Sequence, residues 1–247
     1  AQQYPSKPVR LIVPFAPGGG TDITARAVAQ KLTEAWGQPV IADNRPGANG
    51  TIGVDLAAKS APDGYTITMI SSSHTVNVSL YSKLPYDLVR DLTPVTQATS
   101  QPYAMVIHPS LPARTVKEFI AYAKAKPGGI NYGSSGTGGI AHLGGAWIGH
   151  IAGIEMVHIP YKGGAPATLD MIAGRTQMQL GTLLLTGPHI KAGKLRALAV
   201  TTPKRWHGTP ELPTVAEAGV PGFAITQWYG MSNDERSRIM AELPQRI

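Results

Sequence analysis

The chain has 247 residues, 43% of them hydrophobic, so it is long enough for one large domain or two small ones. Its formal net charge of +7 comes from 22 Lys and Arg against 15 Asp and Glu, but only 15% of residues are charged, so the excess is thinly spread. The absence of cysteine excludes a disulfide framework, a cysteine-ligated zinc site and a thiol nucleophile. No apolar run reaches the length of about 18 residues that suggests a membrane-spanning helix.

The first part of the chain alternates short apolar segments with glycine-rich turns. With 28 Gly and 21 Pro, the composition indicates many tight turns rather than a helical bundle. In chain order we expect a strand at 9–13, a helix that Thr21 or Asp22 caps and Gly37 ends, a strand at 39–42, a short helix through Ala57 and Ala58, and a strand at 65–70. The polar stretch up to Ser100 predicts no further element.

The same alternation of short strands, glycine-rich turns and helices begins again after Ser100. We expect a strand at 103–108, a helix at 115–126, a strand at 130–132, a helix to about Ile151, a strand at 156–159, a helix at 165–173, and strands at 178–180 and 195–201. Alternating strands and helices predict an α/β protein with parallel sheets, whose functional loops lie at the carboxyl ends of the strands. Two such blocks predict two lobes, one made of residues 1–100 and 220–247 and the other of residues 101–219, with their glycine-rich loops facing a cleft.

A glycine-rich loop at 14–22 joins the first expected strand to the first expected helix. Glycines let a ligand approach the backbone, and the first amides of a helix carry partial positive charge. Such a site suits a carboxylate or a phosphate without a charged side chain. The alternative interpretation is that the glycines only form a tight turn. The loop is not a nucleotide P-loop, because no Gly-Lys-Ser/Thr follows its glycines.

The loop at 133–139 repeats this arrangement in the second block and adds the hydroxyl groups of Ser134, Ser135 and Thr137. Its glycine spacing formally matches the dinucleotide-binding fingerprint, which also needs an acidic residue at the end of the next strand. That strand is followed instead by Pro160-Tyr161-Lys162. Nucleotide binding therefore stays a secondary hypothesis.

Two further loops follow expected strands. Ser71-Ser72-Ser73-His74 offers hydroxyls and amides, and Tyr161-Lys162-Gly163 offers an aromatic ring and a cation at the same rim. For Lys162, and likewise for Arg45, a solvated surface cation is an equally good interpretation.

A hydrolase that uses Ser134 or Ser135 is the main alternative from a different class. The segment at 133–137 lacks the last glycine of the Gly-x-Ser-x-Gly elbow. The candidate general bases are His74, His142, His150 and His158. None of them stands in a recognisable relation in the sequence to a serine and a carboxylate. Sparse acids, no His-x-x-x-His pair and scattered cations also argue against metal and nucleic-acid binding, and we expect no cofactor.

Several motifs, taken together in chain order, are more specific than any one loop. They lie at residues 4–10, 14–22, 44–50, 61–65, 132–136, 158–163 and 213–217, and include Pro-Phe-Ala-Pro-Gly-Gly-Gly-Thr-Asp and His-Ile-Pro-Tyr-Lys-Gly. This combination resembles the Bug (TctC-like) family of periplasmic solute-binding proteins of tripartite tricarboxylate transporters. The resemblance extends from Tyr4 to about Gly230.

The resemblance implies a two-lobe, type II periplasmic-binding fold whose lobes close like a clamshell. It also implies that the protein is not an enzyme. It implies capture of a small carboxylate, such as a dicarboxylate, a tricarboxylate, an acidic amino acid, nicotinate or an aromatic acid, and delivery to membrane transporter subunits. The small-residue start at Ala1 is consistent with an exported chain whose signal peptide has been removed, although a trimmed chain would look the same. We expect a monomer.

The resemblance also implies a ligand site to which both lobes contribute. The first loop would hold one carboxylate through backbone amides and water, the second loop would grip from the other lobe, and two serines would line the floor. The expected ligand-binding residues are Phe15, Ala16, Pro17, Gly18, Gly19, Thr21, Asp22, Ser72, Ser73, Ser134, Ser135, Gly136, Thr137, Gly138 and Tyr161.

The sequence departs from the family pattern in two places. Many members carry an acidic residue near Gly181-Thr182, and its absence leaves a contact with a ligand amine without support. After Met231 the pattern stops, and residues 232–247 are polar. We therefore expect the C-terminal elements of the first lobe to be missing or altered, through truncation or a frameshift, with lower stability or a partner over the gap.

Overall fold

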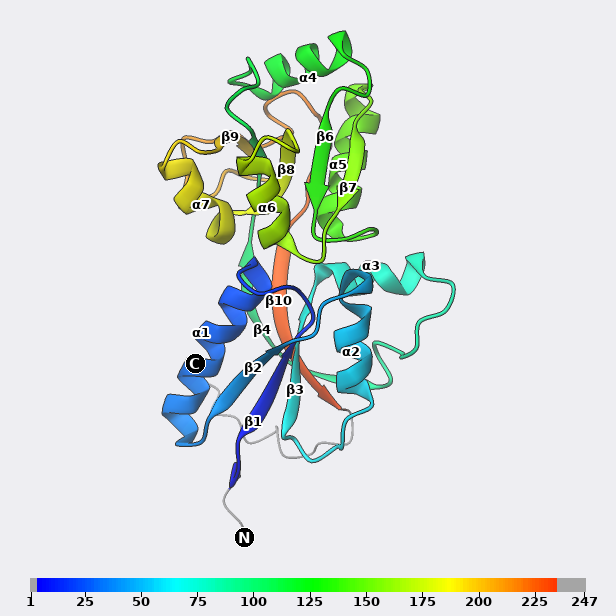
Figure 1. The fold of residues 1–247 in the computed structure, drawn as a ribbon, viewed down its shortest axis with the longest axis vertical. Helices are drawn as coiled ribbons and strands as arrows, with labels where there is room; N and C mark the ends of the chain where they lie inside the picture. The colour runs from blue at the N-terminus through cyan, green and yellow to red at the C-terminus, as the bar shows by residue number, and fades with distance from the viewer. Residues whose placement is uncertain (1–3, 235–247) are drawn as a thin grey trace. The chain divides into compact units, whose positions relative to one another are not determined.

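The computed structural model describes residues 4–234 of the chain. The chain divides into two compact units (Figure 1). Among the described residues, the first unit comprises residues 4–17, 21–99 and 228–234, and the second comprises residues 18–20 and 100–227. The expected processed start at residues 1–3 and the expected polar tail beyond residue 234 lie outside the described residues. Within those limits, no helix is both long and apolar enough to cross a membrane.

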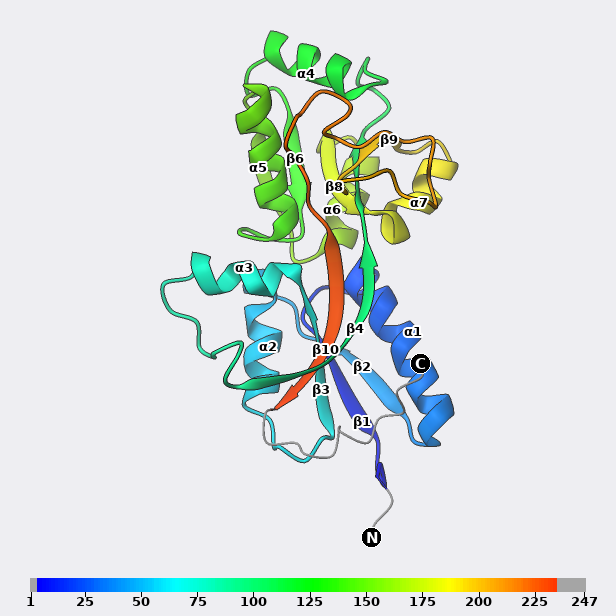
Figure 2. The ribbon, with the colours of Figure 1, turned by 180° about the vertical axis from the view of Figure 1, so that it is seen from behind.

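The first unit is built on a five-stranded sheet with the order β2-β1-β3-β10-β4. Its strands are β1 (Val9–Val13), β2 (Val40–Asn44), β3 (Thr66–Ser71), β4 (Leu92–Gln101) and β10 (Gln227–Asp234). Its helices are α1 (Gly20–Trp36), the short 3-10 helix η1 (Ala48–Gly50), α2 (Thr51–Ala58) and α3 (Ser72–Leu80). Figures 1 and 2 show α1 and α2 on opposite sides of this sheet.

The second unit is built on another five-stranded sheet, with the order β7-β6-β8-β5-β9. Its strands are β5 (Tyr103–Ile107), β6 (Asn131–Ser134), β7 (Val157–Pro160), β8 (Met178–Thr182) and β9 (Arg196–Val200). Its helices are α4 (Val116–Ala125), α5 (Ile140–Ala152), α6 (Gly164–Ile172) and α7 (Leu183–Lys191).

Both sheets are mixed, and the expectation of purely parallel sheets is wrong. β1 pairs in parallel with β2 and β3, and β6 with β7 and β8. β10 is antiparallel to β3, and β5 is antiparallel to β8 and β9. β5 and β10 are the strands that follow the two points where the chain passes from one unit to the other. No helical crossover from a strand of the same sheet precedes them, so the rule that makes crossover-linked strands parallel does not apply.

Apart from residues 18–20, which group with the second unit, the chain passes between the units at residues 99–100 and again at 227–228. The second crossing differs from the expected position near Gly219, and residues 220–227 belong to the second unit rather than to the first. Phe223 and Ile225 explain the difference, because both side chains are buried in the hydrophobic core of the second unit.

Helix α4 illustrates how local sequence sets an element. The hydroxyl of Thr115 caps the helix by accepting a hydrogen bond from the amide of Glu118 at 3.1 Å. Val116, Phe119 and Ala123 recur at helical spacing and are fully buried on one face. The opposite face is charged and exposed, so the helix lies at the surface of the second unit.

The end of β10 places a polar side chain in the core of the first unit. Tyr229 and Met231 alternate along the strand and pack into that core. Asn233 continues the alternation at 1% exposure, and neither its Oδ1 nor its Nδ2 has a hydrogen-bond partner among the described residues. An unpaired buried polar group costs about 1–3 kcal/mol. Asn233 is therefore a destabilising residue on a core-facing position.

Replacing Asn233 with valine should raise the free energy of unfolding by about 1–2 kcal/mol, because an unpaired amide is exchanged for a β-branched apolar side chain. Urea denaturation followed by circular dichroism measures the change. Ser232→Ala is the matched control: the Ser232 hydroxyl donates to the carbonyl of Thr93 at 2.7 Å, so its loss should lower stability by about 0.5–1.5 kcal/mol. An Asn233→Val protein no more stable than wild type would contradict this account of β10.

Candidate functional site

The first glycine-rich loop links β1 to α1. β1 is almost entirely buried, and Gly18 in the following loop has a φ of +77°, which residues with a side chain rarely adopt. α1 begins at Gly20, so Thr21 and Asp22 lie inside its first turn, and their expected role as the N-cap is wrong. Both side chains are buried. The loop thus delivers the chain directly into a helix N-terminus, where the amides carry partial positive charge.

Asp22 is held by neighbouring side chains. Its Oδ1 accepts a hydrogen bond from Asn44 Nδ2 at 2.8 Å, and its Oδ2 accepts one from Arg26 Nε at 3.0 Å. Asn44 Nδ2 also donates to the carbonyl of Phe15 at 3.0 Å. The hydrogen bond from Arg26 to this carboxylate raises the pKa of the guanidinium. Asp22 therefore braces the loop from the inside, with its negative charge opposed by Arg26.

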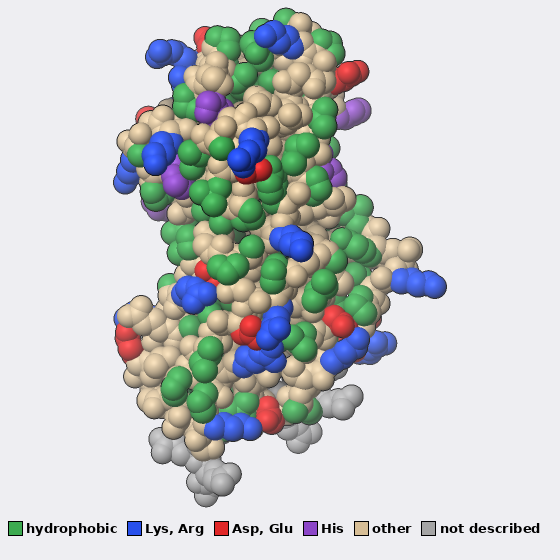
Figure 3. All heavy atoms as spheres, viewed as in Figure 1, with side chains coloured by type: hydrophobic (Ala, Val, Ile, Leu, Met, Phe, Trp, Pro, Cys, Tyr) green, Lys and Arg blue, Asp and Glu red, His purple; other side chains and the backbone are tan. Residues whose placement is uncertain are grey.

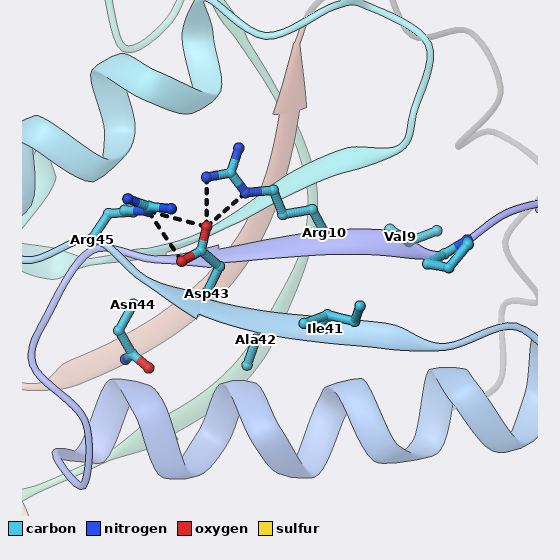
Figure 4. Close-up of a pocket in the computed structure, with 8 residues that line it drawn as sticks. Val9, Arg10, Ile41, Ala42, Asp43, Asn44 and Arg45 are labelled. Atoms are coloured by element: carbon cyan, nitrogen blue, oxygen red, sulfur yellow. Dashed lines mark hydrogen bonds and ion pairs between the residues drawn. The ribbon is translucent and has the colours of Figure 1, made fainter.

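A shallow pocket of about 420 Å³ lies on the first unit beside β1 and β2 (Figure 4). The Asp43 carboxylate in this pocket binds Arg10 Nε at 2.7 Å and Arg45 Nε at 3.0 Å. Burial raises the pKa of Asp43, but the two guanidinium groups outweigh it and hold the pKa below its usual value. Arg45 is thus committed to an ion pair, and none of the expected ligand-binding residues lines this pocket.

His74 connects three loops of the first unit. Its Nδ1 accepts a hydrogen bond from the amide of Ser71 at 2.9 Å, which places Ser72 and Ser73 at the start of α3. Its ring lies 5.6 Å from the ring of Phe15 in the β1–α1 loop. A methyl group on Gly50, which precedes α2, would come within 2.3 Å of His74 Nε2. His74 is fully buried, and burial lowers its pKa to about 4, so the ring is neutral.

Helix α2 is fitted closely against two of the same loops. A Cβ on Gly53 would lie 2.8 Å from Pro14 Cα and 2.9 Å from the carbonyl oxygen of Arg45. The turn before α2 is strained, since Ala48 and Asn49 have φ values of 46° and 51°. Strain at such a position is retained when the surrounding structure over-determines it. The glycine at 53 lets α2 set the position of Pro14.

The β6–α5 loop of the second unit divides its residues into two alternating sets. The amide of Gly136 donates to Ser134 Oγ at 3.2 Å, and the amide of Gly138 donates to His142 Nδ1 at 3.0 Å. Ser135 and Thr137 make no hydrogen bond to any other described residue, and Thr137 is exposed. The even-numbered positions therefore hold the loop, while the odd-numbered ones leave their polar groups available to a ligand.

Ser134 and His158 form a pair that the sequence analysis did not find. His158 Nε2 lies 2.7 Å from Ser134 Oγ, although 24 residues separate them. The hydroxyl is fully buried, accepts from the amide of Gly136 and lies 3.0 Å from the carbonyl oxygen of Gly136. Its one proton goes either to that carbonyl or to His158, and burial lowers the pKa of His158 to about 4, so the ring is neutral and a weak base. The pair is therefore a structural contact and not an activated nucleophile.

Tyr161 is hydrogen-bonded to other residues of the second unit. Its hydroxyl donates to Asp170 Oδ2 at 2.8 Å, and its amide donates to the carbonyl of Ser134 at 3.0 Å. Burial, reinforced by the Asp170 carboxylate, raises the pKa of Tyr161 to about 12. Lys162 beside it is exposed. Tyr161 consequently supports the second loop from behind.

Thr182 is a polar residue that sequence reasoning noted only as a departure from the family pattern. It ends β8 and stands at the N-cap of α7, with 4% exposure. Its Oγ1 is buried and has no hydrogen-bond partner among the described residues. A buried, unpaired hydroxyl at the carboxyl end of a strand adds a polar group to the second unit that the sequence patterns do not reveal.

The described residues contain no group of three or more His, Asp or Glu side chains arranged to hold a metal ion. Lys and Arg side chains are dispersed over the face shown in Figure 3. Both units share an α/β arrangement in which a strand leads through a glycine-rich loop to a helix N-terminus that suits an anion.

The sequence matches the tripartite tricarboxylate transporter family receptor (TctC) over residues 24–243, a match that runs past Met231. Protein BugT of Bordetella pertussis is 39% identical over 233 residues, which are 94% of this chain and 72% of BugT. The chain therefore belongs to the TctC receptor family, and the resemblance to Bug proteins is confirmed.

Solved structures agree with this assignment. Rpa4515 of R. palustris with adipate has a TM-score of 0.93 and 37% identity, covering 96% of this chain and 79% of that one. The periplasmic binding protein BugD has a TM-score of 0.90 and 34% identity, covering 94% and 77%. MatC of Rhodopseudomonas palustris with bound malate has a TM-score of 0.88 and 28% identity, covering 94% and 79%. The two-lobe periplasmic-binding fold is confirmed, and the protein belongs to a family of binding proteins, not enzymes.

Gly53→Ala should lower the free energy of unfolding by about 1–3 kcal/mol, because the added methyl group meets backbone atoms of Pro14 and Arg45 that cannot move independently. Gly187→Ala is the matched control. Gly187 lies within α7, and a Cβ there has no atom within 4 Å apart from its chain neighbours, of which Pro188 disfavours a side chain before it in a helix, so the change should alter stability by less than about 1 kcal/mol. Thermal denaturation of both variants measures the difference. Equal effects would mean that α2 does not set the loop.

The free energy of unfolding should fall as the pH drops from about 6.5 to about 4, because unfolded His74 takes up a proton that the folded protein, with a pKa of about 4 at this residue, refuses. Within that window His74 alone lowers the free energy of unfolding by about 1.4 kcal/mol for each pH unit of acidification, and above the window the free energy of unfolding does not change with pH through this residue. His74→Asn keeps an acceptor near Nδ1 but cannot be protonated. Urea denaturation at several pH values should give it a shallower slope than wild type; identical slopes would refute this role.

Proposed function

We propose that this protein captures a small dicarboxylate through the backbone amides of its glycine-rich loops and passes it to the membrane subunits of a tripartite tricarboxylate-type transporter. The alternation in the β6–α5 loop carries the proposal. Ser135 and Thr137 make no hydrogen bond to any other described residue, just before the N-terminus of α5. Such groups suit a carboxylate oxygen, since the helix terminus adds a favourable field and no cation is needed.

The dicarboxylate class is supported by two related structures, one with adipate and one with bound malate. Each of those ligands has two carboxylates. The chain offers two helix N-termini that follow glycine-rich loops, those of α1 and α5. We expect each of these loops to bind a carboxylate.

The structure suggests different roles among the residues expected from the sequence. We propose direct contact with the ligand for the residues in the two glycine-rich loops and at the starts of α1 and α3: Phe15, Ala16, Pro17, Gly18, Gly19, Thr21, Ser72, Ser73, Ser135 and Thr137. We assign a supporting role to those bonded within the protein: Asp22, Ser134, Gly136, Gly138 and Tyr161.

The transporter partner is supported by the name of the family, and a periplasmic location by the periplasmic relative BugD. We propose an exported protein that binds its ligand as a monomer. The dispersed positive charge would only favour the encounter with an anion.

The ligand is tested by thermal shift and calorimetry with acetate, adipate, malate, citrate and benzoate, together with adipamide as a neutral copy of adipate. Adipate or malate should raise the melting temperature and bind measurably, because both carboxylates are met by amides. Adipamide should do neither. If adipamide binds as well as adipate, carboxylate recognition is refuted, and if no acid binds, the function itself is.

Thr137→Asp should abolish dicarboxylate binding, because it places a negative charge beside the proposed carboxylate position. Thr137→Asn is the matched control, since it has nearly the same size and no charge, and should bind within about threefold of wild type. An acidic group just before a helix N-terminus does not destabilise the helix, so both variants should fold. Equal affinities of the two variants would place the ligand elsewhere.

A further inference from the structure

Two histidines form a stacked pair behind the β6–α5 loop. The ring of His142, on the first turn of α5, lies 3.8 Å from the ring of His158 on β7, at an interplanar angle of 26°. Tyr132 on β6 flanks the pair, with its ring centroid 5.1 Å from that of His158 and 6.3 Å from that of His142. Three elements of the second unit thus meet at these rings.

Each ring holds a different residue of the loop. His142 Nδ1 accepts the hydrogen bond of the Gly138 amide at 3.0 Å, so this nitrogen carries no proton and the ring is neutral with its proton on Nε2. His158 Nε2 is hydrogen-bonded to the hydroxyl of Ser134 at 2.7 Å, with the donor set by the tautomer of the ring. The pair therefore fixes residues 134, 136 and 138, which are the positions that do not face a ligand in the proposed site.

We propose that His142 and His158 are positioning residues for carboxylate binding: through the Gly138 amide and the Ser134 hydroxyl they hold the loop so that Ser135 and Thr137 present unbonded polar groups. The inference rests on the proposed function. According to it, the affinity for the ligand depends on two side chains that do not touch the ligand.

The surroundings of the pair keep both rings neutral. Burial lowers the pKa of His142, and burial together with His142 lowers the pKa of His158. Burial raises the pKa of Tyr132 to about 12, so it too is uncharged. The other titratable groups on the packed elements are His150 at the last turn of α5, Glu155 before β7, and the Tyr161–Asp170 pair beyond it. Protonated His142 would turn an N–H toward the Gly138 N–H and break the contact.

The test compares variants that keep or remove one contact. His142→Asn retains an acceptor near Nδ1, and His158→Gln retains a donor near Nε2, whereas leucine at either position retains neither. Calorimetry with adipate should show affinity about tenfold weaker for each leucine variant and within about threefold of wild type for the amide variants. Leucine variants that fold, by circular dichroism, and bind as wild type does would overturn the proposal.

A pH series separates positioning from simple packing. As the pH falls below the lowered pKa of His142, wild-type affinity should fall more than that of His142→Asn, which has no ring to protonate; ligand protonation is common to both and cancels. Parallel profiles over a pH range in which nitrogen NMR shows that His142 becomes protonated would overturn the proposal.

Nitrogen NMR of the labelled wild-type protein gives an answer that depends on neither folding of a variant nor ligand. At pH 7.5, His142 should have an unprotonated Nδ1 and a protonated Nε2, and the reverse tautomer would overturn the contact with Gly138. If wild type binds no acid in the panel, the proposed function fails, while this measurement still decides whether His142 holds the loop.

Discussion

Backbone amides can bind an anion only when something other than those amides keeps their loop in place. A glycine-rich loop does not easily keep a single conformation by itself, because glycine loses more conformational freedom on ordering than any other residue. In the described part of this chain, neutral histidines meet the requirement. His74 Nδ1 accepts the amide of Ser71 in the first unit, and His142 Nδ1 accepts the amide of Gly138 in the second. In both cases burial lowers the pKa of the imidazole and favours its neutral form, so the residue that orders the loop adds no cation to the proposed carboxylate site.

The need to hold the loops in place also explains why charged side chains near them form ion pairs and hydrogen bonds within the protein. Asp22 binds Arg26 and Asn44, and Asp43 binds Arg10 and Arg45. An unpaired carboxylate beside the α1 N-terminus would compete with an anionic ligand, whereas a paired one braces the loop. Preorganisation of this kind improves affinity by reducing what must be ordered when the ligand arrives. The low charge content of the chain is therefore compatible with anion binding.

Sequence patterns predicted the elements whose burial is local and periodic. The apolar run of β1 and the capped, amphipathic α4 were found close to their observed bounds. Helix α3 was missed because its sequence, Ser-Ser-His-Thr-Val-Asn-Val-Ser-Leu, has little amphipathic character, and its start depends on the contact between Ser71 and His74. Strand β10 was missed because its polar end is specified by pairing with β3, which lies far away in the sequence. The expected contact residues came from loop positions, but the pair of Ser134 and His158, 24 residues apart, has no spacing rule that could announce it.

The alternation in the β6–α5 loop has a consequence for how ligand preference can change over time. Ser134, Gly136 and Gly138 carry the hydrogen bonds that define the loop, whereas Ser135 and Thr137 carry none among the described residues. Substitutions at the second set leave the loop's own bonds intact, and their effects on stability should be small. Mutation can therefore explore new side chains at two positions without first destroying the scaffold. Two related structures hold different acids, adipate in one and malate in the other, and freedom of this kind allows such differences.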